Sequence, residues 1–187
     1  NVRGALKISG LGQLTISGGQ YAIYSTGTLT IGTSVIKIYG SGIYSGSTIS
    51  LDGAMLDMTN INSYSAMACA IKTNYNLYID GVAIGIYGPN SVTLSGTSTA
   101  VGVTGISANY IETSASMGLQ VSGNAISSVT KTYINGGTLD IVIKKNDTCG
   151  INAKEISIAK GTLNFSGESE GFPNYGLYAT DQITISG

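Results

Sequence analysis

Four side chains at one repeated position of the chain have the chemistry to contact a carbohydrate. Tyr24, Tyr44, Lys72 and Tyr87 each follow an aliphatic residue in a short segment that recurs along the sequence. Because side chains alternate in a β-strand, we expect these four to point outward. Exposed aromatic rings pack on the apolar faces of sugars, and a Tyr hydroxyl both donates and accepts hydrogen bonds. They form our candidate carbohydrate-binding row, with the alternative that Tyr, a common strand residue, simply covers the surface.

Two acidic residues are secondary candidates, for a metal site. Asp52 and Asp80 each precede a Gly, at a position that we expect to be equivalent in consecutive repeats. Adjacent carboxylates can bind Ca²⁺ or act as an acid/base pair. Asp-Gly is also among the commonest turn dipeptides, and we take a turn as the explanation. We therefore expect no metal, no cofactor and no catalytic residue.

The two cysteines are predicted to be free thiols. Cys69 and Cys149 each lie two residues before the aliphatic residue of their segments. If three or four repeats of about 4.8 Å separate them, they are roughly 14–19 Å apart. A disulfide needs Cα atoms within about 7 Å. The chain has no His, which excludes a Ser-His-Asp triad and the usual zinc sites.

A repeated segment, small–Ile/Leu–any–small, predicts the elements that hold these side chains. It reads AIYS at Ala22–Ser25, GIYS at Gly42–Ser45, AIKT at Ala70–Thr73, GIYG at Gly85–Gly88, GISA at Gly105–Ala108, AISS at Ala125–Ser128, GINA at Gly150–Ala153 and GLYA at Gly176–Ala179. The second residue of each segment is an aliphatic anchor. Self-similarity at intervals of about 20–50 residues is typical of a solenoid, in which each repeat covers the apolar surface of the next.

Two further alternating apolar pairs follow most anchors. One pair comes six and eight residues after the anchor, as in Leu29/Ile31, and another comes later, as in Ile36/Ile38. Each repeat therefore predicts three short strands between Gly-rich turns. Three strands in so short a repeat favour a parallel β-helix over a four-stranded propeller blade. The irregular repeat length favours the right-handed form, so we expect an all-β, right-handed parallel β-helix of seven or eight coils.

One repeat is too short for this scheme. Ile71 and Ile86 are 15 residues apart, which spans at most about 50 Å when extended. Either this coil lacks its third strand, or the segment at Gly85–Gly88 matches by accident inside a longer coil. The spacing from Ile86 to Val92 and Leu94 favours the first alternative.

Length and composition indicate a single β-helix domain over residues 1–187. Net charge is −1 and Arg3 is the only Arg, so a basic nucleic-acid surface is absent. No apolar run is long enough to span a membrane. The chain starts without Met, and its first and last strands, within Ala5–Gly10 and Gln182–Gly187, are in the same phase of the repeat. We therefore expect it to be a fragment of a longer protein.

Three phrases carry a family resemblance. They are LTISGG (Leu14–Gly19), SGIYSGSTISLDGAMLDM (Ser41–Met58) and INGGTLDI (Ile134–Ile141). They resemble the pectate-lyase-like β-helix repeats of secreted or surface proteins of gut bacteria, which are often labelled carbohydrate-binding. The resemblance covers nearly the whole chain and lies in residues that build the fold. It implies an extracellular or cell-surface location in a bacterium.

The sequence thus leads to a functional hypothesis with two alternatives. We expect a non-enzymatic segment of a surface or secreted protein, an adhesive stalk whose partner is a polysaccharide or host glycan. One alternative is a polysaccharide-active lyase or glycoside hydrolase whose carboxylates converge in a way that sequence spacing hides. The other is a purely structural spacer.

Overall fold

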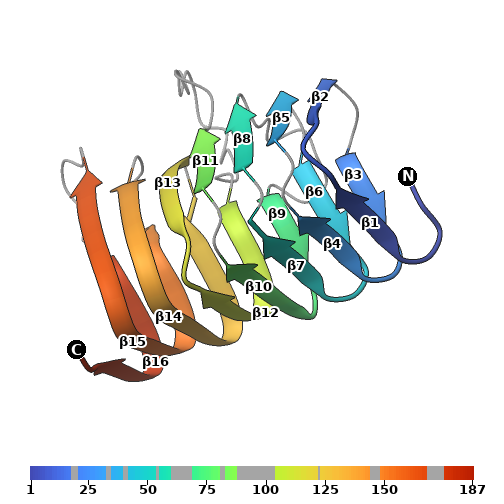
Figure 1. Cartoon of the computed structure of the whole chain (residues 1–187). Coiled ribbons are helices and arrows are strands. Elements are labelled where there is room, and N and C mark those ends of the chain that lie inside the picture. The colour runs from blue at the N-terminus through green and yellow to red at the C-terminus, as the bar shows by residue number, and fades with distance from the viewer. Residues whose placement is uncertain are drawn as a thin grey trace, which may run out of the picture.

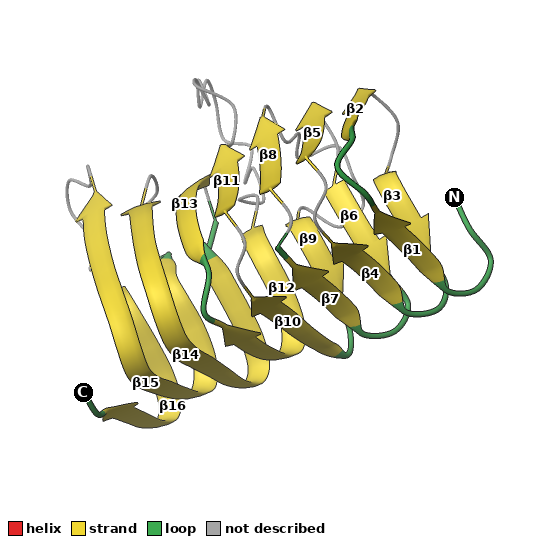
Figure 2. Ribbon diagram, viewed as in Figure 1, coloured by secondary structure: helices red, strands yellow, loops and turns green. Residues whose placement is uncertain are grey.

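The computed structural model describes residues 1–17, 21–32, 35–39, 42–53, 55–59, 69–80, 83–87, 104–121, 123–143, 148–167 and 175–187. Within these ranges every regular element is a strand, as Figure 2 shows, and all of the strand pairs are parallel. The chain winds as a solenoid in which each strand pairs with its equivalent one turn earlier and one turn later (Figure 1). The predicted all-β parallel β-helix is confirmed.

The first ladder contains the anchor strands. It runs through β3 (Tyr21–Ser25), β6 (Gly42–Ser45), β9 (Cys69–Thr73) and the first parts of β12 (Thr104–Thr113), β14 (Ile126–Ile143), β15 (Cys149–Gly167) and β16 (Tyr175–Ile185). Its anchors are in register and stack inside the solenoid. Those that are buried, with at most 3% of their surface exposed, are Ile23, Ile43, Ile71, Ile106, Ile126 and Ile151.

The second and third ladders complete each turn. The second runs through β1 (Leu6–Ser9), β4 (Leu29–Gly32), β7 (Ile49–Asp52) and β10 (Asn76–Asp80), and then through later parts of β12, β14, β15 and β16. The third runs through β2 (Gln13–Ser17), β5 (Val35–Tyr39), β8 (Met55–Thr59), β11 (Ala83–Tyr87) and β13 (Ser116–Val121), and then through the ends of β14 and β15. We call the outward sides of the three ladders the first, second and third face.

The segment at Gly85–Gly88 matches the repeat by accident and lies inside a longer coil. The expectation that this coil lacks a third strand is wrong. Strand β11 lies on the third ladder, where Ile86 pairs with Met58 and Leu119. Ile86 is therefore not an anchor, and the next anchor is Ile106. Val92 and Leu94 lie outside the described residues. The solenoid has fewer complete turns than expected, also because its first and last turns are partial.

Buried hydroxyl groups line the corner between the first and second ladders. Ser25, Ser45 and Thr73, the last residues of their repeated segments, are stacked in register and almost fully buried. The Ser45 hydroxyl donates to the carbonyl of Gly27, at 2.7 Å, and accepts a bond from the amide of Ser47, at 3.1 Å. Each hydroxyl thus satisfies backbone groups of the bend that the strand ladders leave unpaired.

The first residue of the segment is small because the next turn passes close to it. A Cβ atom added to Gly105 would lie 2.5 Å from the carbonyl oxygen of Ala125, and one added to Gly42 would lie 2.6 Å from that of Cys69. Both distances are shorter than a van der Waals contact. At Gly42 and Gly105 the backbone of the neighbouring turn therefore leaves no room for a Cβ atom without a local shift.

The opposite placement of neighbouring residues gives a first prediction. Ile43 is 1% exposed, whereas Tyr44 is half-buried on the outside. We expect Ile43→Asp to unfold the domain, because an unpaired buried carboxylate is destabilising by several kcal/mol. Tyr44→Ala should lower the free energy of unfolding by about 1 kcal/mol, the value of an aromatic pair. Urea denaturation followed by circular dichroism measures both, and equal destabilisation would contradict the assignment.

A second prediction concerns the corner hydroxyls. The Thr73 hydroxyl donates to the Ser47 carbonyl and accepts a bond from the Tyr75 amide, at 3.1 Å. Thr73→Val keeps the shape but leaves both backbone groups unpaired, which should reduce the free energy of unfolding by about 1–3 kcal/mol. Thr73→Ser keeps the hydroxyl and serves as the control. A Val variant as stable as the Ser variant in thermal unfolding would show that the hydroxyl is not needed.

Candidate functional site

The structure brings together three of the four residues in the predicted row. Tyr24, Tyr44 and Lys72 occupy the same register position on β3, β6 and β9. Tyr87 does not belong with them, because it lies on the third ladder, paired with Thr59 and Gln120. Its place in the row was inferred from the accidental repeat at Gly85–Gly88. The row on the first face continues instead through Ser107, Ser127, Asn152 and Tyr178.

The tyrosine rings at the start of this row are packed on one another. The centroids of Tyr24 and Tyr44 are 5.4 Å apart, and their planes differ by 23°. Tyr21 is tilted against both rings, with centroid distances of 5.4 Å to Tyr24 and 5.8 Å to Tyr44. Near-parallel rings at this distance overlap face to face with an offset. The Tyr24 face toward Tyr44 is therefore covered, and these tyrosines offer a ligand mainly ring edges and hydroxyls.

Beyond Lys72 the row consists of small polar side chains until it reaches a second aromatic pair. Ser107, Ser127 and Asn152 are half-buried, and Tyr178 is 41% exposed and lies 5.6 Å from Tyr175 between ring centroids. At about 4.8 Å per turn, Tyr44 and Tyr178 are roughly 24 Å apart. The first face is thus a strip of small polar side chains between two aromatic clusters. Its hydrogen-bonding groups are hydroxyls, one amide and one ammonium group.

Asp52 and Asp80 are adjacent, as expected from their spacing. They are direct partners on β7 and β10, and both are exposed. The amide of Gly53 donates to the backbone carbonyl of Asp80 at 3.0 Å, and the Ser114 hydroxyl donates to the Asp80 carboxylate. Among the described residues no group of three or more His, Cys, Asp or Glu side chains could hold a metal ion.

Cys69 and Cys149 are free thiols, which confirms the prediction. They occupy equivalent positions of the first ladder, on turns separated by those of Thr104 and Asn124. Both are partly buried, and burial raises the pKa of each thiol. For Cys69 this effect exceeds the opposing influence of Lys72 and of the hydroxyls of Thr104 and Ser107. Because only the thiolate is strongly nucleophilic, neither cysteine is activated for chemistry.

The second face carries a group of polar and aromatic residues that the sequence analysis did not identify. Its outward positions on β10, β12, β14 and β15 form two neighbouring rows. One row contains Asn76, Tyr110, Lys131 and Glu155, and the other contains Tyr78, Glu112, Tyr133 and Ser157.

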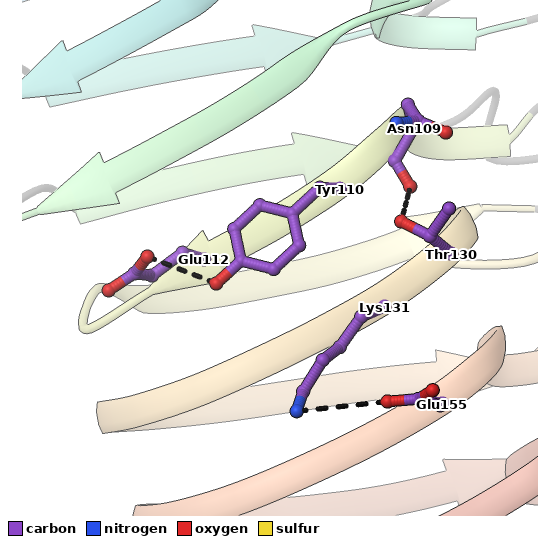
Figure 3. Close-up of polar contacts among 6 residues, drawn as sticks. All are labelled: Asn109, Tyr110, Glu112, Thr130, Lys131 and Glu155. Carbon is purple, nitrogen blue, oxygen red and sulfur yellow. Dashed lines mark hydrogen bonds and ion pairs between the residues drawn. The ribbon is translucent and has the colours of Figure 1, made fainter.

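Several of these side chains contact one another (Figure 3). The Tyr110 hydroxyl donates to Glu112 Oε2 at 3.1 Å, and Lys131 Nζ lies 3.9 Å from Glu155 Oε2. Asn76 Nδ2 donates to the Tyr78 hydroxyl at 3.0 Å. Each contact joins unlike groups, in contrast to the stacked tyrosines of the first face.

Tyr110 is affected by burial and by a neighbouring carboxylate. Burial, followed by the charge of Glu112 and the hydrogen bond to it, raises the pKa of Tyr110 to about 12. A tyrosinate next to an ionised carboxylate is disfavoured by like-charge repulsion. The Glu112 carboxylate would attract a cation.

These residues were missed because two interior positions of the second ladder are Thr. The strands read Tyr-Ile-Glu-Thr at 110–113 and Lys-Thr-Tyr-Ile at 131–134, and Thr113 and Thr132 are buried. Their hydroxyls are paired, with Ala115 N donating to Thr113 Oγ1 at 3.0 Å and Thr132 Oγ1 lying 2.8 Å from Ser128 Oγ. A β-bulge between Ala108 and Tyr110 also shifts the spacing from the anchor. If Thr had been allowed at interior positions of the alternating pattern, the outward residues of this face would have been identified from the sequence.

Comparison with known proteins does not add to this description. No family model matches the chain, and neither the curated proteins nor the solved structures that were searched give a match. Among the described residues there is no helix that is long and apolar enough to cross a membrane.

The raised pKa of Tyr110 gives a third prediction. Below pH 10 Tyr110 is protonated in both the folded and the unfolded chain, whereas between pH 10 and about 12 the unfolded chain ionises first, so its contribution to stability is lost over this interval. We expect the absorbance titration of the native protein minus that of Tyr110→Phe to show a midpoint near 12. Glu112→Gln should lower this midpoint, because it removes the carboxylate charge. A midpoint at the ordinary tyrosine value, unchanged by Glu112→Gln, would contradict the interaction.

Proposed function

We propose that this chain is a non-enzymatic β-solenoid domain of a bacterial surface or secreted protein, an adhesive stalk that binds an extended polysaccharide along its first face. The observation that carries the proposal is the row that begins with Tyr24, Tyr44 and Lys72 and ends at Tyr178, all in one register. A polysaccharide is itself a linear repeat. A row of evenly spaced hydrogen-bonding groups suits such a ligand better than it suits a compact molecule.

The dimensions of the row support this assignment. Successive side chains are about 4.8 Å apart, which is close to the size of a sugar ring. A chain lying along the solenoid axis would meet hydroxyl groups of Ser107 and Ser127 and the amide of Asn152. On either side of these polar groups, Tyr44 and Tyr178 would offer ring edges and hydroxyls.

The residue types of the row support binding over catalysis. Glycoside hydrolysis requires a pair of carboxyl groups on either side of the scissile bond. The row consists of Tyr, Lys, Ser and Asn residues and contains no carboxylate. It therefore offers hydrogen bonds and one positive charge without a general acid or base.

The location rests on the sequence resemblance to pectate-lyase-like repeats of secreted and surface proteins of gut bacteria. A rigid parallel solenoid is well suited to such a place, because it extends by adding turns without changing its cross-section. Adhesion follows if the ligand is a cell-surface or dietary polysaccharide.

The fourth prediction tests the first face. Binding to a glycan array, followed by calorimetry with the best neutral polysaccharide, should identify a ligand of the native domain. The triple variant Tyr24→Ala/Tyr44→Ala/Lys72→Ala should bind it at least about tenfold more weakly, on the basis of about 1 kcal/mol for each aromatic contact.

A matched control removes the same residue types from another face. Lys37 and Tyr39 lie on β5 of the third ladder, and Lys37→Ala/Tyr39→Ala should leave the affinity unchanged. Unaltered binding by the triple variant would move the site elsewhere. No binding of any glycan by the native domain would favour a purely structural spacer.

A further inference from the structure

The second face contains a shallow depression where β10, β12 and β14 lie side by side. Its volume is about 260 Å³, and it is lined by Tyr78, Ile79, Asp80, Glu112, Thr113, Ser114 and Asn135. These residues come from consecutive turns and include a carboxylate on each of two neighbouring strands. The depression is separate from the row on the first face, since it is formed by a different ladder.

The lining of the depression is acidic. It contains Asp80 and Glu112 and neither Lys nor Arg. The nearby Lys131 is the register partner of Tyr110, and its ammonium group is directed to Glu155 of the following turn (Figure 3). The positive charge of Lys131 is thus engaged with another carboxylate. Glu112 also raises the pKa of Tyr110, after the larger effect of burial.

An aromatic ring borders the two carboxylates. Tyr78 is 37% exposed, and its ring lies 6.2 Å from that of Tyr110 with an interplanar angle of 58°. At this angle the two rings do not cover each other face to face. In contrast to Tyr24 and Tyr44, Tyr78 can therefore present ring surface to a ligand, beside groups that attract a positive charge.

We propose that this depression binds a protonated amino sugar of a polysaccharide, with Asp80 and Glu112 receiving the ammonium group and Tyr78 packing against the sugar ring. Asn135 supplies donors and an acceptor for the ring hydroxyls, and the Ser114 oxygen, whose proton is donated to Asp80, can accept a further bond. The site differs from the first face in the charge it selects, and it does not depend on the function proposed there.

The mixture of groups favours a sugar over a basic peptide. A lysine side chain presents one ammonium group on a flexible apolar stem, which would leave the amide of Asn135 without a matching group. An amino sugar presents an ammonium group, several hydroxyls and one apolar face on a rigid ring. That combination corresponds to the carboxylates, the polar side chains and the aromatic ring of the depression.

The test compares two oligosaccharides of the same backbone, one with a free amino group on each sugar and one with an uncharged N-acetyl group in its place. Calorimetry should show binding of a glucosamine hexamer, and binding of the N-acetylglucosamine hexamer at least about tenfold weaker, because acetylation removes the positive charge. Added salt should weaken the first interaction. Equal affinity for the two hexamers would overturn the proposal, as would equal or tighter binding of a lysine hexamer.

Substitutions locate the site and separate it from the first face. Glu112→Gln, Asp80→Asn and Tyr78→Ala should each weaken glucosamine-hexamer binding, the first two by about tenfold. Asp57→Asn makes the same charge change on β8 of the third ladder, away from the depression, and should have no effect. The triple variant of the first face should also bind the glucosamine hexamer normally. Unchanged binding by Glu112→Gln and Asp80→Asn, with circular dichroism like that of the native protein, would place the amino sugar elsewhere.

Discussion

The spacing between parallel strands on successive turns, about 4.8 Å, governs both the interior and the surface of this protein. The strands hydrogen-bond to their equivalents on neighbouring turns, so a side chain on one turn lies beside the side chain at the equivalent position of the next turn. In the interior this produces stacked aliphatic side chains, such as Ile43 on Ile71 and Leu29 on Ile49. At the corners it produces the small residues, because the next backbone comes within 2.5 Å of an added Cβ atom at Gly105.

The same spacing decides what each face can offer to a ligand. Where neighbouring turns carry the same aromatic residue, as at Tyr24 and Tyr44, the rings stack and cover each other. Where neighbouring positions carry unlike groups, as at Lys131 and Glu155 or at Asn164 and Asp140, they form ion pairs and hydrogen bonds. A regular row is therefore stable in itself, and a binding site for a discrete group is better formed where the row is interrupted. At the depression around Asp80 and Glu112 no run of like residues forms, since Tyr78 is paired with Glu112.

Most of the fold could be predicted from the sequence, because solenoid periodicity repeats the same information on each turn. The anchors from Ile23 to Ile151 other than Ile86, the parallel pairing and the free cysteines all follow from spacing. Tyr87 was misplaced because Gly85–Gly88 satisfies the small–Ile–any–small pattern while lying on the third ladder. The second face was missed because Thr113 and Thr132 satisfy their hydroxyls internally and so occupy interior positions that the pattern reserved for aliphatic residues. The periodicity of the sequence predicts the positions of the strands well, but it does not predict which group a polar side chain hydrogen-bonds to.

The distribution of charge distinguishes the two faces more sharply than their shapes do. The row on the first face has Lys72 and neutral hydrogen-bonding groups, whereas the depression on the second face has Asp80 and Glu112. With a net charge of only −1 over the whole chain, neither face is dominated by the overall charge of the molecule, and local groups decide what each attracts. A polysaccharide that carries both neutral and amine-bearing residues would find different partners on adjacent sides of the same solenoid. Two weak contacts on one rigid body raise the effective affinity for such a polymer far beyond that of either contact, provided that the polymer can reach both faces.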